Sequence, residues 1–208
     1  MRSLTAPTTP DIAIDLSNLA TLLYDTNRLA EAEPLMRRAL AIDETSFGLD
    51  HPNVAIDLNN LAALLQATNR MAEAEPLMRR ALAIDEAAYG TDHTMVAIRL
   101  NNLAKLLLAT NRPADAEPLM RRALAIDEAS YGADHPMVAI RLNNLAMLLK
   151  ATNRLPEAEP LMRRALEILT ASLGEAHPNT MIVAENYAGL LQALGKTDDE
   201  IRESLLPG

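Results

Sequence analysis

A block of 42 residues returns along almost the whole chain, and this repetition limits the possible folds more than any other feature. Residues 53–94 and 95–136 are identical at 33 of 42 positions. Clear versions of the motif NNLAxLL begin at Asn59, Asn101 and Asn143, and divergent versions begin at Ser17 and Glu185. A fixed period of this length is the sequence signature of a solenoid, in which each repeat covers the apolar face of its neighbours.

The first half of each repeat predicts one helix, shown best by the second repeat. Asp50 or His51 can cap this helix, and Pro52 lies near its first position, where the missing N–H of proline costs nothing. Asn69 can adopt the left-handed conformation that ends a helix. The apolar residues of the helix share one face at helical spacing: Val54, Leu58, Leu61, Ala62 and Leu65.

The second half of the repeat predicts a helix over residues 71–89. Pro76 falls in or just after its first turn, and Gly90 is the expected stop. Glu75 and Arg79 are four residues apart, in the favourable order for an ion pair on a helix. The same pair returns in the other repeats as Glu33 with Arg37, Glu117 with Arg121 and Glu159 with Arg163.

The repeats predict an all-α chain with one folded domain and about ten helices. We expect a disordered segment at 1–10 and a single solenoid over 11–208. Its repeats are expected at about 11–52, 53–94, 95–136 and 137–178, with a partial capping repeat at 179–206. Thr197 and Glu200 have the spacing of a capping box, which would open a short last helix.

The composition fits packed helices and excludes several classes of protein. Hydrophobic residues make up 49% of the chain but aromatic residues only 2%, so the core must come from Leu, Ala, Met, Ile and Val. The formal net charge of −9 argues against a nucleic-acid partner. The chain has no Cys, which excludes disulfides and thiolate chemistry. There is no signal peptide and no run of about 18 apolar residues, so we expect no membrane contact and a cytoplasmic location.

Taken together, these motifs resemble the tetratricopeptide repeat (TPR) of the long, 42-residue kind found in kinesin light chains and many bacterial proteins. The matching text is LNNLAxLL, ATNR, AEAEPLMRRALAIDE, YG and DHP, over about residues 11–194. The resemblance implies antiparallel helix pairs stacked in a right-handed α-solenoid, whose first helices line a concave groove for extended peptides. In kinesin light chains this groove takes cargo peptides, often acidic ones, partly through Asn side chains. The present chain has no heptad coiled coil, so the motor-subunit role is not implied.

Two columns of asparagines are the most suggestive polar feature. Both lie away from the Leu/Ala core face on a helical wheel. A side-chain amide offers donors and an acceptor, which match the backbone of an extended peptide. The alternative is that one Asn in each repeat bonds to the backbone of the neighbouring repeat. One column holds Asn18, Asn60, Asn102, Asn144 and Asn186, and the other holds Asn59, Asn101 and Asn143.

The charge on the first helices changes sign along the chain. Asp15 and Asp57 occupy the repeat position that Arg99 and Arg141 fill later. Asp25 adds negative charge early, and Lys105 and Lys150 add positive charge later. One interpretation is a groove that is acidic at its N-terminal end and basic over repeats three and four, where it would hold an acidic segment. The alternative is ordinary variation on solvated surfaces. The predicted peptide-binding residues are Asn59, Asn60, Arg99, Asn101, Asn102, Lys105, Arg141, Asn143, Asn144 and Lys150.

Other repeated residues have structural interpretations. Four histidines lie 42 residues apart, and stacked repeats are separated by about 8–10 Å, too far for one metal site. We expect them to cap helices. The Arg-Arg doublets, such as Arg79-Arg80, are expected to be neutralised by nearby carboxylates, and the repeated methionines to fill the core. The histidines are His51, His93, His135 and His177.

The sequence contains no catalytic set, phosphate loop or metal motif, so we expect neither enzymatic activity nor a cofactor. The leading hypothesis is a module that binds an extended, acidic peptide segment of a partner protein. The alternative is an assembly protein that forms homo-oligomers through the ends or faces of the solenoid. A consensus-like array without a specific partner is a third reading of the near-identical repeats.

Overall fold

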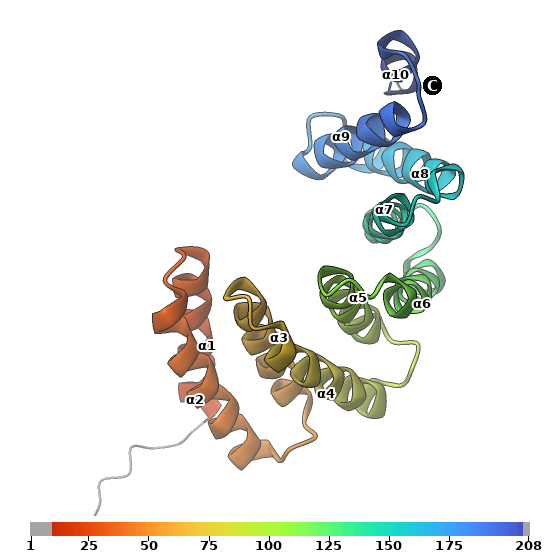
Figure 1. Ribbon diagram of the computed structural model, residues 1–208. Helices are drawn as coiled ribbons and strands as arrows, with labels where there is room; N and C mark the ends of the chain where they lie inside the picture. Colours follow the sequence, from red (N-terminus) through yellow and green to blue (C-terminus); the bar gives the residue numbers. More distant parts are fainter. Residues whose placement is uncertain (1–9, 206–208) are drawn as a thin grey trace, which may run out of the picture. The chain divides into compact units, whose positions relative to one another are not determined.

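In the computed structural model, residues 10–205 are described, and every regular element in that range is an α-helix (Figure 1). The ten helices of this range confirm the predicted all-α fold class. Helices of 16 residues alternate with helices of 19 residues until the short last one. Their bounds are α1 Pro10–Asp25, α2 Leu29–Phe47, α3 Pro52–Ala67, α4 Met71–Tyr89, α5 Thr94–Ala109, α6 Pro113–Tyr131, α7 Pro136–Ala151, α8 Leu155–Leu173, α9 Pro178–Ala193 and α10 Asp198–Leu205.

The chain divides into two compact units, and the division falls inside α5, between Leu106 and Leu107. In the first unit, α1 packs on α2, α2 on α3 and α3 on α4. In the second unit, α6 packs on α7, α7 on α8, α8 on α9 and α9 on α10. Each unit is therefore a stack of helix–turn–helix pairs. The prediction of disorder at 1–10 lies outside the described residues except for Pro10, the first residue of α1.

A histidine starts the first helix of each later repeat. The Nδ1 atom of His51 accepts a hydrogen bond from the backbone N–H of Asn53, 3.2 Å away, so His51 and not Asp50 caps α3. The bonds at His93, His135 and His177 are equivalent. The ring of His51 stacks on Phe47 at 4.5 Å, which ties the cap to the end of the preceding helix. The expected capping role is confirmed.

The helix ends follow from residues that tolerate positive φ. Asn69 has φ 61°, as predicted for the turn between α3 and α4. Gly90 has φ 88°, and its N–H donates to the Glu86 carbonyl at 3.0 Å. Pro76 is the sixth residue of α4 and therefore lies in the second turn. The Thr197 hydroxyl accepts from the Glu200 N–H at 3.3 Å and the Glu200 carboxylate accepts from the Thr197 N–H at 2.8 Å, which is the predicted capping box.

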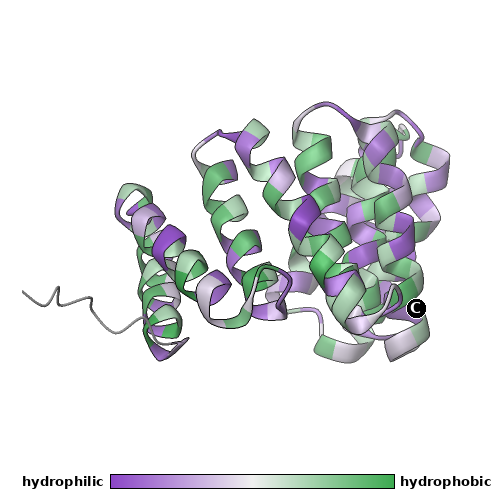
Figure 2. Ribbon diagram, turned by 90° about the horizontal axis from the view of Figure 1, so that it is seen from below, coloured by the Kyte–Doolittle hydropathy of each residue, from purple (hydrophilic) through white to green (hydrophobic). Residues whose placement is uncertain are grey.

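Small and aliphatic side chains build the core of both units. Leu58 and Leu61 of α3 are 0% and 1% exposed, and Ala81 of α4 is fully buried. Each helix carries both hydrophobic and hydrophilic stretches, as Figure 2 shows. The repeated methionines are core residues as expected, with exposures of 6% or less at Met36, Met78, Met120 and Met162.

Ion pairs join neighbouring repeats on the second helices. The predicted pair of Glu75 with Arg79 forms at 2.7 Å. Sequence reasoning missed the larger network around Arg70, which bonds both to Glu73 at 2.7 Å and to Glu33 of the previous repeat at 2.8 Å. The hydrogen bond from Arg70 is the main reason that the pKa of Glu33 lies below its usual value. Arg154 makes the equivalent bonds in the second unit, to Glu157 and Glu117.

The Arg-Arg doublets at 79–80 and 163–164 are neutralised, as expected. Arg80 pairs with Glu44 of the previous repeat at 2.6 Å and donates to the Leu49 carbonyl at 2.8 Å. Arg164 pairs with Glu128 at 2.8 Å in the same way. These side chains therefore join repeats and do not form a basic strip for anions.

Candidate functional site

The first helices carry isoleucines at one repeat position that do not join the core. The exposed fraction is 55% for Ile14, 44% for Ile56 and 54% for Ile182. Ile98 and Ile140 at the same position are half-buried. We call these five residues the isoleucine column. Sequence reasoning missed it, although five isoleucines 42 residues apart, three of them two positions before the core residues Leu58, Leu100 and Leu142, should have marked it.

The asparagine columns lie beside the isoleucine column and bond partly to each other. The Asn102 amide donates to the Asn59 side-chain oxygen at 3.0 Å, and Asn186 donates to Asn143 at 3.1 Å. Each of these asparagines therefore bonds to a side chain of the adjacent first helix. The structural alternative had predicted a bond to the backbone of the neighbouring repeat. Each of these amides keeps further donor or acceptor capacity, because one bond uses only part of what an amide offers.

The remaining asparagines differ in burial. Asn101 is 4% exposed and Asn144 is half-buried. Asn60 is half-buried and lines a cavity of about 190 Å³ with Tyr24 and Met36. Ser17 stands where the next repeats have an Asn, and its hydroxyl donates to Asp57 at 3.1 Å. The amide-to-amide bond of the later repeats is therefore replaced at the first pair of repeats.

Arg99 and Arg141 do not form the exposed basic surface that their position suggested. The Arg99 Nε donates to Asp85 at 2.7 Å, and the two side chains are 5% and 1% exposed. Arg141 binds Asp127 in the same way, at 2.7 Å. Each Asp lies 14 residues before its Arg, on the second helix of the previous repeat. These arginines therefore neutralise buried carboxylates between repeats.

The two lysines of the predicted site remain nearer to the surface. Lys105 is exposed and Lys150 is half-buried. A Cβ built on Gly189 of α9 would lie 3.1 Å from the Lys150 Nζ, so this ammonium lies against the next first helix. Asp15 and Asp25 of α1, which were predicted to make the N-terminal end of the groove acidic, are exposed.

Asp57 is 6% exposed and differs from these surface acids. Its pKa is raised to about 6, mainly by burial and also by the nearby Asp43 carboxylate, while the Ser17 hydrogen bond acts to lower it. The pKa of Asp43, also 6% exposed, is raised by burial and lowered by His51. The two acids line a cavity of about 210 Å³ with Ile14 and other residues of α1 and α3.

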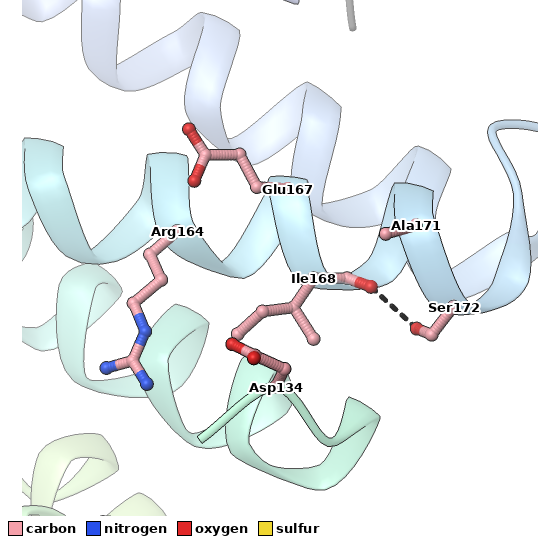
Figure 3. Close-up of a pocket in the computed structure, with 6 residues that line it drawn as sticks. All are labelled: Asp134, Arg164, Glu167, Ile168, Ala171 and Ser172. Atoms are coloured by element: carbon pink, nitrogen blue, oxygen red, sulfur yellow. Dashed lines mark hydrogen bonds between the residues drawn. The ribbon is translucent and has the colours of Figure 1, made fainter. Parts of the chain in front are cut away.

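A third cavity, of about 370 Å³, lies between α8 and the loop before α7 (Figure 3). Its Arg164 side chain is already bonded to Glu128 and to the Ala133 carbonyl. The Ser172 hydroxyl donates to the Ile168 carbonyl at 2.6 Å. We assign this recess to the packing of neighbouring repeats.

Residues 10–205 contain no group of three His, Cys, Asp or Glu side chains that could hold a metal ion. Within the same range, no helix is long and apolar enough to cross a bilayer.

The fold defines a class of protein, the helical repeat arrays built from stacked helix–turn–helix pairs. A tetratricopeptide-repeat profile matches residues 11–87, 58–129, 100–171 and 139–202, which together cover most of the chain. The chain belongs to the tetratricopeptide-repeat family. Comparison with curated proteins finds no match.

Several solved structures share the fold. Nearly identical TPR-like repeats from a kinesin light chain-like protein of Podosopora anserina match with a TM-score of 0.80 and 23% identity, over 94% of this chain and 92% of that one. BtubC (BKLC) from P. vanneervenii matches with a TM-score of 0.81 and 24% identity, over 95% and 78%. YrrB, a TPR protein with an unusual peptide-binding site, matches with a TM-score of 0.55 and 17% identity, over 93% and 84%.

The predicted resemblance to kinesin light chain-like TPR proteins is confirmed. Tetratricopeptide repeats are protein-interaction modules that are in general not enzymes. The chain is therefore a protein-interaction scaffold whose partners are peptides or proteins.

Proposed function

We propose that the first helices bind an extended peptide along the face that carries the isoleucine column. The exposure of these isoleucines is the observation that carries the proposal. Ile56 is 44% exposed on a helix whose leucines are 0–1% exposed. The isoleucine column, exposed at Ile14, Ile56 and Ile182 and half-buried at Ile98 and Ile140, gives a partner a row of apolar contacts, beside a row of amides that can bond its backbone.

The spacing of the row suggests the form of the peptide. Adjacent first helices are direct neighbours, because α7 packs on α9 and side-chain hydrogen bonds join Asn102 to Asn59 and Asn186 to Asn143. Packed helices lie about 8–10 Å apart. Three residues of a polyproline II helix span about 9 Å and return to the same face. A peptide with an apolar residue at every third position therefore matches the isoleucine column within one unit.

Charge supports an acidic peptide next to Lys150 and Lys105. Lys150 Nζ lies against Gly189 of α9, three residues after Asn186, which bonds to Asn143. From there the ammonium can reach a carboxylate on the peptide. Arg99 and Arg141 leave this role, because their side chains hold Asp85 and Asp127. The proposed contacts in the first unit are Asn59, Asn60, Asn102 and Lys105 with Ile14, Ile56 and Ile98, and those in the second unit are Asn143, Asn144 and Lys150 with Ile140 and Ile182. Asn101 leaves the set because it is 4% exposed.

Fluorescence polarisation with labelled peptides tests this proposal. The probe is a short peptide with Leu at every third position and Glu between, and a scrambled peptide of the same composition is the control. We expect Ile56→Asp to weaken binding about tenfold or more, because it places a charge in an apolar contact. Leu49→Asp is the matched control, because Leu49 is 60% exposed but lies in the loop before α3. Equal binding of both peptides, or equal loss in both variants, would refute the proposal.

Self-association is the second candidate function, and the exposed edge of α1 favours it. Leu19 and Leu22 are 47% and 60% exposed, whereas Leu61 and Leu64 at the same repeat positions of α3 are 1% and 0% exposed. These leucines offer a second copy the kind of surface that joins repeats. Sedimentation equilibrium over a range of concentrations tests this candidate. A dimer that Leu22→Glu dissociates would support it, and a monomer at every concentration would exclude it.

A further inference from the structure

The joints between repeats differ in charge at one pair of positions. A joint here means the contact between the second helix of one repeat and the first helix of the next. In the joint between α4 and α5, Asp85 holds Arg99 at 2.7 Å. In the joint between α6 and α7, Asp127 holds Arg141 at the same distance. Both pairs are buried and electrically neutral.

The first joint, between α2 and α3, has no cation at this place. Its residues at the two positions are Asp43 and Asp57, each 6% exposed. The last joint, between α8 and α9, has the buried apolar residues Leu169 and Val183 there. The first joint is therefore the one joint among the described repeats that buries two carboxylates at these positions without a basic side chain.

The two carboxylates keep unused acceptors. Asp57 Oδ1 accepts from the Ser17 hydroxyl, but Asp57 Oδ2 and Asp43 Oδ1 are inaccessible to solvent and have no hydrogen-bond partner. Asp85 also has one oxygen without a partner, but its other oxygen holds Arg99. Buried acceptors are nearly always bonded in folded proteins, so two in one place point to a missing donor.

The carboxylates line a cavity that has room for a side chain. Its volume is about 210 Å³, below the range of about 300–1,000 Å³ that is usual for sites of drug-sized ligands. The lining comes from α1, α2 and α3 and includes the exposed residues Ile14, Asn18 and Ile56. The cavity thus lies on the same face as the isoleucine column, where a partner can reach it.

We propose that this cavity binds the guanidinium group of an arginine side chain supplied from outside the repeats, at the place that Arg99 and Arg141 fill in the later joints. A guanidinium presents five N–H donors in a planar fork and can serve both carboxylates at once. Because Asp57 Oδ2 and Asp43 Oδ1 are inaccessible to solvent, binding requires the two side chains to turn toward the cavity. The aliphatic stem of arginine can lie along Ile14 and Ile56 while its head is bonded. The inference does not depend on the proposed peptide, because a single blocked amino acid suffices as the probe.

The test titrates N-acetyl-arginine amide into the isotope-labelled protein of 208 residues and follows backbone amide shifts by NMR. We expect shift changes confined to residues of α1, α2 and α3 around the cavity. The citrulline analogue has nearly the same shape without the charge and is expected not to bind. The lysine analogue is expected to bind more weakly, because an ammonium lacks the planar fork.

Variants of the two acids locate the site. Asp57→Asn should weaken binding about tenfold or more, since one charge-assisted partner is lost. Asp57→Arg should abolish binding and raise the melting temperature, because it supplies the guanidinium within the chain, as at Arg99. Asp15→Asn is the matched control, since Asp15 has the same repeat position in α1 but is exposed, and it should leave binding unchanged.

The pH dependence gives a second readout. His51 acts on the Asp43 carboxylate, and Asp43 acts on the Asp57 carboxylate, whose pKa is about 6. Protonation of Asp57 should weaken binding about tenfold between about pH 7.5 and pH 5. This dependence should be smaller in Asp57→Asn.

A further arm concerns the source of the arginine. An arginine-containing extended peptide should bind more tightly than the blocked amino acid if a partner supplies the group. Equal binding of the peptide and the blocked amino acid would show that the side chain alone is recognised, from whatever source it comes. Equal binding of the citrulline analogue, unchanged binding to Asp57→Arg, shift changes away from α1, α2 and α3, or binding of Ca²⁺ at the same residues in preference to arginine would each overturn the proposal.

Discussion

The Asp57→Asn substitution should make the protein more stable at neutral pH, although it removes a charge at a repeat position where the next two repeats also have a charged residue. The Asp57 carboxylate is 6% exposed and has only the Ser17 hydroxyl as a donor, and Asp43 stands beside it. Its folded pKa of about 6 lies above the reference value of 3.8. The folded state therefore holds the proton more tightly than the unfolded state. The contribution of Asp57 to the free energy of unfolding should therefore fall as the pH rises from about 4 to about 6 and stay reduced above that.

The magnitude follows from the size of the shift. A difference of about two pH units between the folded and unfolded pKa is worth about 3 kcal/mol once the group is ionised. The asparagine of the Asp57→Asn variant does not ionise. The free energy of unfolding of the variant minus that of the unaltered protein should therefore be larger at about pH 7.5 than at about pH 4, by up to about 3 kcal/mol. Asparagine also keeps an oxygen that can accept the Ser17 bond.

Urea unfolding followed by far-UV circular dichroism at several pH values measures this difference. Repeat arrays can unfold in parts, so amide hydrogen exchange in α3 should be recorded with it. Asp85→Asn provides the control in the next joint, because Asp85 neutralises the buried Arg99, and its loss should destabilise by about 3–5 kcal/mol at neutral pH. A gain from Asp57→Asn that is the same at both pH values, or a loss of stability at neutral pH, would refute the argument.

Three further predictions concern other contacts between and within repeats. Arg141→Ala should destabilise by about 3–5 kcal/mol by leaving Asp127 buried and unpaired, and an apolar replacement of both residues should restore most of the loss, as measured by urea unfolding. Arg70→Ala should lower the stability slightly, and by less at high salt, because Arg70 and Glu33 are partly exposed, as measured by urea unfolding at two salt concentrations; a loss independent of salt would contradict this. Asn69→Ala should cost about 1 kcal/mol and Asn69→Gly nearly nothing, because φ at this position is 61°, and thermal unfolding of the two variants compares them.

Most of the fold could be predicted because the repeat supplies each signal four or five times. The bounds of α4, the left-handed turn at Asn69 and the stop at Gly90 all agree with expectation. These features depend on residues within a few positions of each other. Local stereochemistry therefore decides them, and the sequence displays it directly.

The roles of charged residues in the joints could not be predicted in the same way. Arg99 was interpreted as a surface cation because charged side chains usually remain in water. Its partner Asp85 lies 14 residues earlier on another helix, and the pairing depends on how the layers are placed. The hydrogen bond from the Asn102 side chain to the Asn59 side chain likewise joins residues 43 positions apart. Contacts of this kind depend on packing between repeats, which periodicity alone does not define.

The central claim is that the isoleucine face of the first helices binds an extended peptide, and methyl NMR of isoleucine-labelled protein tests it most directly. The spectrum contains its own control, because Ile42, Ile84, Ile126 and Ile168 of the second helices are 3–6% exposed. On addition of the peptide with Leu at every third position, the methyl signals of Ile14, Ile56, Ile98, Ile140 or Ile182 should move while those of the core isoleucines stay in place. Movement of the core signals alone, or of none, would contradict the claim.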